Sequence, residues 1–411
     1  MGRTIQLALA GSSAVAVAFG FARYGYGLFV PTFREEFGLS TGAVGLVSSA
    51  GYATYLTAMA AVGFLSGRVG PRFPVVAGAL CAGVGMLLIA TAQGPPALVA
   101  GVLLAGTSPA LCVAPFADAV AMMVGEGRRD RVLSAVSTGT TLGLAAAGPI
   151  VLLTAAGGRA DGPGWRYAWA AFAATAFLVA LWNARLLPGE PYRGAAADAA
   201  GEEGAGAGRF LRRGSAPLLG QAFAYGMTGA FYYTYAVDLV RQSGLGEAWG
   251  PILWGLVGLA GVTGVFSGDT AARFGRGVSL AACLFVLAAS VGGLGVAGGS
   301  GPLVAACAVA FGASYFPVAA LLVVWSGSVF HERPTAGLSA VLFSLALGSV
   351  VGPAVLGAIA EILDLRVAFW CAAALTALSI ALGPSSNIHS TTPGASAKGP
   401  EPAAWADTDG E

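Results

Sequence analysis

A single basic side chain interrupts the first apolar run of the sequence. Arg23 lies 11 residues before Arg34, which stands at the outer end of that run. In a helix this spacing corresponds to about 16 Å at about 1.5 Å per residue, close to the middle of a bilayer. An arginine there is costly and usually faces a bundle interior or a water-filled cavity. Its planar guanidinium can bind a carboxylate at two points or serve as a structural partner of helix carbonyls, and we expect Arg23 to bind an anionic substrate.

Tyrosines are concentrated beside this arginine and in the run that begins the second half of the chain. Six of the 11 tyrosines fall in these two runs, namely Tyr24, Tyr26, Tyr225, Tyr232, Tyr233 and Tyr235. Such a density indicates a polar cavity, although tyrosines also form belts at membrane interfaces. The interfacial interpretation is favoured for Tyr225 and Tyr235 and stays open for Tyr232 and Tyr233. The residues that we expect to bind substrate with Arg23 are Tyr24, Tyr26, Tyr232, Tyr233, Tyr315 and Trp325.

Carboxylates are rare in the apolar runs. Asp118 falls a few residues from the end of the fourth run. A buried carboxylate there could carry a proton, or it could join the arginines of the neighbouring loops in an ion-pair network. We favour the network. Asp238 and Glu361 both lie near the outer ends of their runs and are expected to be interfacial.

The sequence lacks the groups that most metal and cofactor chemistry requires. The five cysteines fall in separate runs, the two histidines are His331 and His389, and the sole lysine is Lys398. No pair has metal-site spacing, and a phosphate loop ending in Gly-Lys cannot occur. The glycine pattern at 293–298 lies inside an apolar run and is interpreted as helix packing. We expect no cofactor and no metal.

Several protein classes are excluded on composition. The net charge is +1 and there is no long basic run, which argues against nucleic-acid binding. A membrane-embedded enzyme needs converging acid, base or metal groups, whereas the charged residues of the apolar runs are dispersed in depth. Residues 385–411 are too few and too polar for a signalling domain. The chain is predicted not to be an enzyme.

The elements that must position these residues are membrane helices. The 411 residues are 56% hydrophobic and 10% charged, against about 25% charged residues in soluble domains. Continuous apolar runs without alternation select helices rather than a barrel. The sequence predicts an all-α membrane protein with twelve spans at 7–32, 41–66, 74–93, 97–123, 131–156, 166–187, 215–240, 247–268, 277–298, 302–326, 335–360 and 366–384. We interpret the first as a span rather than a cleaved signal peptide, because Arg23 interrupts it.

The basic residues predict the orientation. With twelve spans, fifteen of the 21 Lys and Arg residues share the side of the two termini, five lie on the other side, and Arg23 is within the membrane. By the positive-inside rule both termini are predicted to be cytoplasmic, in the cell inner (plasma) membrane.

Composition also divides the chain. Residues 188–214 are rich in Gly, Ala and charges and are predicted to be a flexible cytoplasmic linker. This linker separates an N-terminal six-helix bundle, 1–187, from a C-terminal six-helix bundle, 215–384. Residues 385–411 cannot bury enough apolar surface to fold alone and are predicted to be a disordered cytoplasmic tail.

An internal repeat supports two related halves. The pattern Gly-x-x-x-small-Arg-x-Gly follows both the second and the eighth span, and Gly-Pro recurs in the fifth and eleventh. The first copy contains Gly63, Gly67, Arg68, Gly70 and Arg72, and the second contains Gly268, Arg273, Gly275 and Arg276. The Gly-Pro pairs are Gly148-Pro149 and Gly352-Pro353. Small residues four apart, such as Gly63 with Gly67 or Gly348 with Gly352, predict close helix packing.

These motifs, with the Arg129-x-Arg131 stretch that opens the fifth span, resemble the major facilitator superfamily of secondary transporters over nearly all of the chain up to residue 384. The family's usual aspartate before the first loop arginine is replaced by Gly67 and, in the second copy, Ala272. Residues 21–27, Phe-Ala-Arg-Tyr-Gly-Tyr-Gly, are similar to the first span of a poorly characterised bacterial permease group. Some relatives of that group are similar to cyanate transporters.

The resemblance implies two six-helix bundles around a central cavity and transport by alternating access. It also implies that Asp118 and Arg131 join the loop residues above in a cytoplasmic gate. We therefore expect a secondary active transporter of a small organic solute, anionic because of Arg23 and proton-linked, that works as a monomer in the lipid bilayer. The alternative is an efflux pump for a drug-like or natural-product compound.

Overall fold

The computed structural model describes residues 2–65, 68–157, 164–191, 215–332 and 334–384. Within these ranges the chain is helical and contains no β-strand. Gly67, most of the predicted linker and the predicted tail lie outside the described residues.

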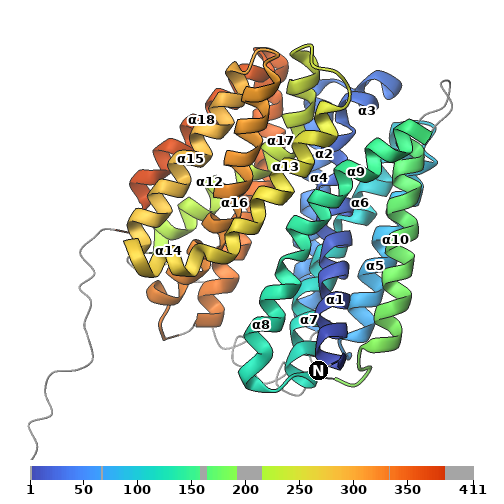
Figure 1. The fold of residues 1–411 in the computed structure, drawn as a ribbon, viewed down its shortest axis with the longest axis vertical. Coiled ribbons are helices and arrows are strands. Elements are labelled where there is room, and N and C mark those ends of the chain that lie inside the picture. The colour runs from blue at the N-terminus through green and yellow to red at the C-terminus, as the bar shows by residue number, and fades with distance from the viewer. Residues whose placement is uncertain (1, 66–67, 158–163, 192–214, 333, 385–411) are drawn as a thin grey trace, which may run out of the picture.

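The first half of the chain runs from blue to green in Figure 1. Its helices are α1 (Gly2–Val15), a π-helical segment (Ala16–Arg23), α2 (Gly25–Leu28), α3 (Val30–Phe37), α4 (Thr41–Leu65), α5 (Arg72–Ala90), α6 (Pro95–Gly106), α7 (Ser108–Met123), α8 (Glu126–Ser137), α9 (Gly139–Gly157) and α10 (Gly164–Leu186).

The second half runs from yellow-green to red and lies beside the first (Figure 1). Its helices are α12 (Ser215–Gln242), α13 (Trp249–Gly261), a 3-10 segment (Val262–Phe266), α14 (Ser267–Phe274), α15 (Arg276–Val296), α16 (Gly301–Val329), α17 (Pro334–Ile362), α18 (Leu365–Ser379) and a final 3-10 turn (Ile380–Leu382).

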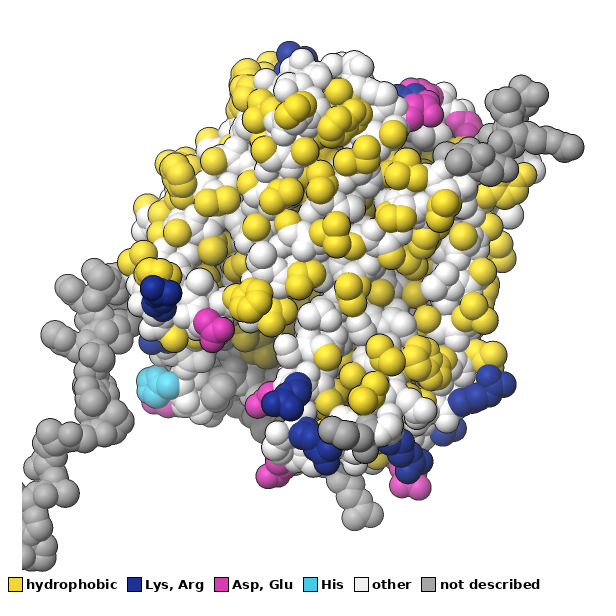
Figure 2. All heavy atoms as spheres, viewed as in Figure 1, with side chains coloured by type: hydrophobic (Ala, Val, Ile, Leu, Met, Phe, Trp, Pro, Cys, Tyr) yellow, Lys and Arg dark blue, Asp and Glu magenta, His cyan; other side chains and the backbone are white. Residues whose placement is uncertain are grey.

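Ten helical segments of the described chain are long and apolar enough to cross a membrane. Each of them overlaps one of ten of the twelve predicted spans. The two remaining positions, 41–66 and 215–240, are occupied by α4 and α12, which are helices of 25 and 28 residues. The all-α prediction is confirmed. In Figure 2 hydrophobic side chains cover the middle of the visible face, and the charged ones lie toward its two ends.

The first span differs from the continuous helix that we predicted at 7–32. It begins at Gly2, passes into the π-helical segment, and breaks at Tyr24 and again at Phe29 before α3 ends at Phe37. Gly20, Gly25 and Gly27 lie in or beside these breaks and Pro31 follows the second, and such residues weaken helix continuity. Segments of π-helix are frequent at functional sites. As a result Arg23 lies at the end of an irregular segment rather than in a regular helix.

Close glycine contacts hold several helices together. A Cβ at Gly348 or Gly352 of α17 would overlap the backbone of α12 at Phe223 or Met227, so the two backbones approach closely at both glycines. Gly148 of α9 lies equally close to Pro251 of α13. The contact between α9 and α13, like that between α4 and α17, joins the two halves.

The packing role predicted for Gly63 with Gly67 cannot be followed in full, because Gly67 lies outside the described residues. A Cβ at Gly63 or at Gly268 would meet no atom within 4 Å, so neither glycine allows a close helix approach among the described residues. Gly275 instead adopts a φ of 83° in the turn between α14 and α15, a conformation that glycine adopts at little cost. Gly70 lies against the backbone of Gly189.

Candidate functional site

Arg23 lies in a group of aromatic rings. Its guanidinium carbon is 4.1 Å from the ring centre of Tyr55 and 4.6 Å from that of Tyr52, both on α4, and 5.6 Å from that of Phe19. Its Nε is buried and has no hydrogen-bond acceptor in the described part of the chain. No carboxylate of that part forms an ion pair with it. The rings compensate the cation in part, and Nε remains available as a donor.

A small cavity reaches this arginine. It has a volume of about 20 Å³ and is lined by Arg23, Tyr26, Ser48 and Tyr52, together with Val102 and small residues of the neighbouring helices. The volume is close to the minimum that holds one water molecule. The hydroxyl of Tyr26 donates to the carbonyl of Val44 at 3.4 Å.

A chain of stacked rings connects the two halves beside Arg23. Tyr24 of the first half stacks on Tyr233 of α12, with ring centres 4.0 Å apart. Tyr233 meets Tyr315 of α16 edge-on at 5.4 Å, and Tyr315 stacks on Tyr225 at 4.5 Å. The hydroxyl of Tyr225 donates to the carbonyl of Tyr315 at 3.0 Å. The structure therefore brings together the predicted residues Arg23, Tyr24, Tyr233 and Tyr315.

Several donors of this cluster have no partner. The hydroxyls of Tyr232 and Tyr233 and the indole nitrogen of Trp254 are buried, and within the described residues none has a hydrogen-bond partner. Tyr232 stacks on Phe311 with ring centres 3.5 Å apart, and Trp254 meets Tyr233 edge-on at 5.9 Å. Buried donors of this kind are costly unless a ligand or water satisfies them.

One predicted substrate-binding residue, Trp325, lies apart from the cluster, and two tyrosines predicted to be interfacial are buried. Trp325 is ten residues beyond Tyr315 on α16, which corresponds to about 15 Å of helix. The prediction that Tyr225 and Tyr235 are interfacial is wrong, because both are buried. Tyr235 donates from its hydroxyl to the carbonyl of Thr41 at 2.7 Å, a contact between the two halves.

Sequence reasoning missed Tyr52, Tyr55, Trp254 and Phe311. Tyr52 and Tyr55 are three residues apart and so share one face of α4. This spacing was the available signal. Phe311 precedes Tyr315 by one helical turn, but single aromatic residues in apolar helices carry no comparable signal.

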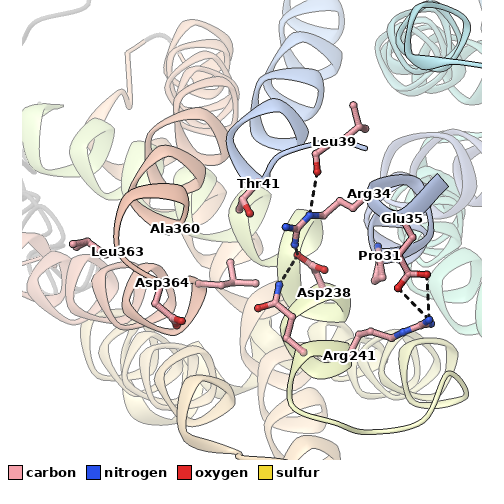
Figure 3. Close-up of a pocket in the computed structure, with 12 residues that line it drawn as sticks. Pro31, Arg34, Glu35, Leu39, Thr41, Asp238, Arg241, Ala360, Leu363 and Asp364 are labelled. Atoms are coloured by element: carbon pink, nitrogen blue, oxygen red, sulfur yellow. Dashed lines mark hydrogen bonds and ion pairs between the residues drawn. The ribbon is translucent and has the colours of Figure 1, made fainter. Parts of the chain in front are cut away.

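Ion pairs join the two halves beside α3, at the end of the molecule opposite the N-terminus (Figure 1), and Figure 3 shows them in close-up. Arg34 of α3 donates from Nη1 to Oδ2 of Asp238 at 2.5 Å, and Gln242 donates to the same oxygen at 3.1 Å. Arg241 pairs with Glu35 at 3.3 Å and with Glu247 at 3.1 Å. Asp238 was predicted to be interfacial, but its side chain is only 4% exposed, because α3 folds over it.

Two cavities flank these ion pairs. One has a volume of about 720 Å³ and includes Arg34, Asp238, Thr41 and Asp364 in its lining. The other has about 480 Å³ and extends toward Trp165 and Pro251. Glu35 and Arg241 line both cavities, so their ion pair separates the two.

Further hydrogen bonds connect the two halves near the same ion pairs. Glu361 of α17 accepts from the hydroxyl of Ser40 at 3.0 Å and from the backbone N–H of Gly42 at the start of α4. Deeper in the molecule, the hydroxyls of Ser48 and Thr234 are 2.7 Å apart. Glu361 is exposed, in agreement with its predicted interfacial place.

The predicted gate residues lie at the other end of the helices. Arg68 and Arg131 are exposed, as are Arg273 and Arg276 at the turn between α14 and α15, and Asp118 is half-buried on α7. Arg72 donates from Nε to the carbonyl of Leu187 at 2.7 Å. Arg129 was not predicted to be a gate residue, but it donates to the carbonyls of Ala121 and Val124 at the end of α7.

Comparison with known proteins decides the family. A family model described as that of the uncharacterised MFS-type transporter YbfB matches residues 15–383. The chain belongs to this family of major facilitator transporters. It is a multi-pass membrane protein whose family serves membrane transport of small solutes, and its members are not enzymes. No curated protein sequence matches significantly. The narrower similarity to cyanate transporters stays a prediction.

Solved structures show the same fold. A bacterial homologue of the human lysosomal transporter Spinster, in an inward-facing and occupied conformation, has a TM-score of 0.72 at 14% identity, covering 92% of this chain and 95% of that one. The nucleoside transporter NupG has a TM-score of 0.72 at 11% identity, covering 93% and 98%. XylE of E. coli, a xylose transporter in a partially occluded inward-open conformation, has 0.71 at 15%, covering 93% and 97%.

Proposed function

We propose that this transporter moves a small organic anion by alternating access and that Arg23 is the residue that binds the anion. The observation that carries the proposal is the guanidinium of Arg23, which lies among four aromatic rings with its Nε unsatisfied. A planar anion such as a carboxylate supplies two acceptors in the geometry that this fork requires.

The surrounding rings support a site shared by both halves. Tyr24 and Tyr233 meet across the interface, and the unpartnered donors of Tyr233 and Trp254 lie on the second half. Substrate bound to Arg23 could recruit these donors, so that binding is coupled to the relative position of the halves. Tyr26 and Tyr232 would line the same site, whereas Trp325 would lie further along the path.

The conformation of this structure is proposed to be closed toward the outer side of the membrane. Arg34, Asp238, Glu35 and Arg241 join the halves at the end away from the N-terminus. The arginine-rich end that carries Arg68 and Arg131 is proposed to be cytoplasmic, together with both termini, in the plasma membrane. Two of the similar solved structures are described as inward-facing or inward-open.

The domain division, the gate network, proton coupling and the monomeric state are proposed from the sequence analysis. The chain would divide into bundles 1–187 and 215–384, joined by the cytoplasmic linker 188–214. Asp118 would belong to the cytoplasmic gate network, and transport would be linked to protons, as the name of one similar structure, a D-xylose-proton symporter, states for that protein. The protein would act as a monomer.

A second candidate function is efflux of a bulky apolar compound. The observation that favours it is the continuous aromatic cluster of Tyr24, Tyr233, Tyr315 and Phe311. Ring faces of this kind accommodate flat apolar molecules with little directional specificity. In this case Arg23 would stabilise the tyrosine cluster without touching the compound.

Ligand-induced thermal stabilisation of the purified full-length protein separates the two functions, because a ligand stabilises the state that it binds. We would compare carboxylates, other small anions, neutral solutes and lipophilic cations on wild type, Arg23→Gln and Arg23→Lys. Arg128→Gln, an exposed arginine of α8, is the matched control.

Stabilisation by one class of anions that is lost in Arg23→Gln, and kept in the control, is the expected result. Arg23→Lys keeps the charge without the fork and should retain weakened binding. Stabilisation by lipophilic compounds that persists in Arg23→Gln would replace the anion proposal with efflux. Flux measured in both directions in proteoliposomes then gives the direction of transport.

A further inference from the structure

A basic cavity lies at the arginine-rich end of the first half, away from both the tyrosine cluster and the outer ion pairs. It has a volume of about 430 Å³ and is formed where the ends of α1, α5, α7 and α10 meet. Its charged lining consists of Arg3, Arg72 and Arg185, and no carboxylate is part of the lining. Three guanidiniums around one cavity produce a local positive field that attracts an anion.

The bonding of these arginines leaves most of their donors available. Arg72 uses its Nε to bind the carbonyl of Leu187 at 2.7 Å, which fixes its position against the end of α10. Arg3 and Arg185 are exposed and form no hydrogen bond or ion pair with a side chain within the described residues. A tetrahedral phosphate group can accept from several guanidinium donors at once.

The surface beside the cavity is apolar rather than open to water. On α10, Leu178, Leu181 and Trp182 share the face of Arg185 one and two turns deeper, and they are 68%, 48% and 38% exposed. Phe73, next to Arg72 at the start of α5, is 62% exposed. In a protein of this family such side chains face lipid, so the cavity lies at the level of lipid headgroups with acyl-chain contacts directly below it.

We propose that this cavity binds the phosphate of an anionic membrane phospholipid. Arg3, Arg72 and Arg185 hold the phosphate, and the acyl chains lie along the apolar face of α10 that contains Trp182. A free phosphate ion has the same charge chemistry but gains nothing from that apolar face. The site is separate from the transport site and would anchor the first half to the membrane surface.

The test is lipid binding to the purified full-length protein, measured by native mass spectrometry and by thermal stabilisation. Dioleoyl phosphatidylglycerol, dioleoyl phosphatidylcholine and inorganic phosphate are the three probes. The variants are R3Q/R185Q, its charge-conserving counterpart R3K/R185K, and Arg128→Gln as a control that removes an arginine from the same end outside the cavity. Arg72 is left intact because of its bond to Leu187.

We expect phosphatidylglycerol to bind wild type and Arg128→Gln alike, at least tenfold more tightly than phosphatidylcholine. R3Q/R185Q should lose about tenfold or more of that affinity, and R3K/R185K should keep most of it.

Equal binding of phosphatidylglycerol to wild type and R3Q/R185Q would overturn the proposal. Saturation by millimolar inorganic phosphate without any preference for phosphatidylglycerol would assign the site to free phosphate instead and overturn the lipid source. If R3Q/R185Q does not fold, R3K/R185K decides: loss of the phosphatidylglycerol preference in that folded variant would also contradict the proposal.

Discussion

Arg34 of α3 and Asp238 of α12 are 204 residues apart in the chain and form an ion pair of 2.5 Å between Nη1 and Oδ2. The side chain of Asp238 is almost completely buried, whereas that of Arg34 is 27% exposed. The pair therefore joins the two halves through a largely desolvated contact at one end of the molecule. In a transporter that alternates between two states, such a contact stabilises one state only.

Asp238→Asn should favour opening of the outer end. Loss of a charge-assisted hydrogen bond removes about 1 to 3 kcal/mol from the closed state, and about 1.4 kcal/mol changes a two-state ratio tenfold. We would introduce Ala360→Cys, a buried position of the outer cavity, after replacing the native cysteines. Its alkylation by a membrane-impermeant reagent should become about tenfold faster or more.

Glu247→Gln is the matched control for this measurement. Glu247 pairs with Arg241 at the same end, but its side chain is 83% exposed, and exposed pairs contribute little. Alkylation at Ala360→Cys should stay close to the wild-type rate in this variant. Equal rates in Asp238→Asn and wild type would show that the ion pair does not hold the outer end closed.

Tyr233→Phe should show whether the hydroxyl of Tyr233 binds substrate, because the substitution is not expected to lower the stability of the protein. Its hydroxyl is buried without a partner in the described part of the chain, so its removal should leave the melting temperature unchanged or slightly raised. Tyr233→Ala also removes the stacking on Tyr24 and should destabilise the protein by about 3 kcal/mol. Reduced substrate affinity in a fully stable Tyr233→Phe protein would place the hydroxyl at the substrate, whereas unchanged affinity would give it no part in binding.

Gly352→Ala should destabilise the helix pair α12–α17. The added Cβ overlaps the backbone at Met227, and overpacking of this kind costs about 1 to 3 kcal/mol. Gly63→Ala is the control, because nothing lies within 4 Å of its Cβ position and alanine favours a helix over glycine. Thermal unfolding in detergent measures both, and equal melting temperatures would contradict the packing role of Gly352.

Asp118→Asn tests the proposed gate network against a role in proton coupling. We expect slower transport that still responds to a pH gradient, because the network shapes the conformational equilibrium without carrying the proton. Proteoliposome flux with and without the gradient gives the answer. Transport that proceeds in this variant but no longer responds to the gradient would assign the coupling proton to Asp118.

The sequence determined the class and the course of the chain, because bilayer thickness and backbone hydrogen bonding restrict long apolar runs to helices. It also indicated Arg23 and the tyrosines around it, since a charge or a cluster of hydroxyls in an apolar run is energetically exceptional. The close packing at Gly348 and Gly352 followed from their spacing. These features depend on local composition.

Tertiary structure decided the relationships between distant residues. The stacking of Tyr24 on Tyr233, the pairing of Arg34 with Asp238, and the burial of Tyr225 and Tyr235 depend on how two halves of the chain meet. The contribution of Tyr52 and Tyr55 to the surroundings of Arg23 depends on which face of α4 is turned toward the π-helical segment that contains Arg23. No periodicity within one helix specifies which side of it a partner will cover, because that choice is made by packing between helices.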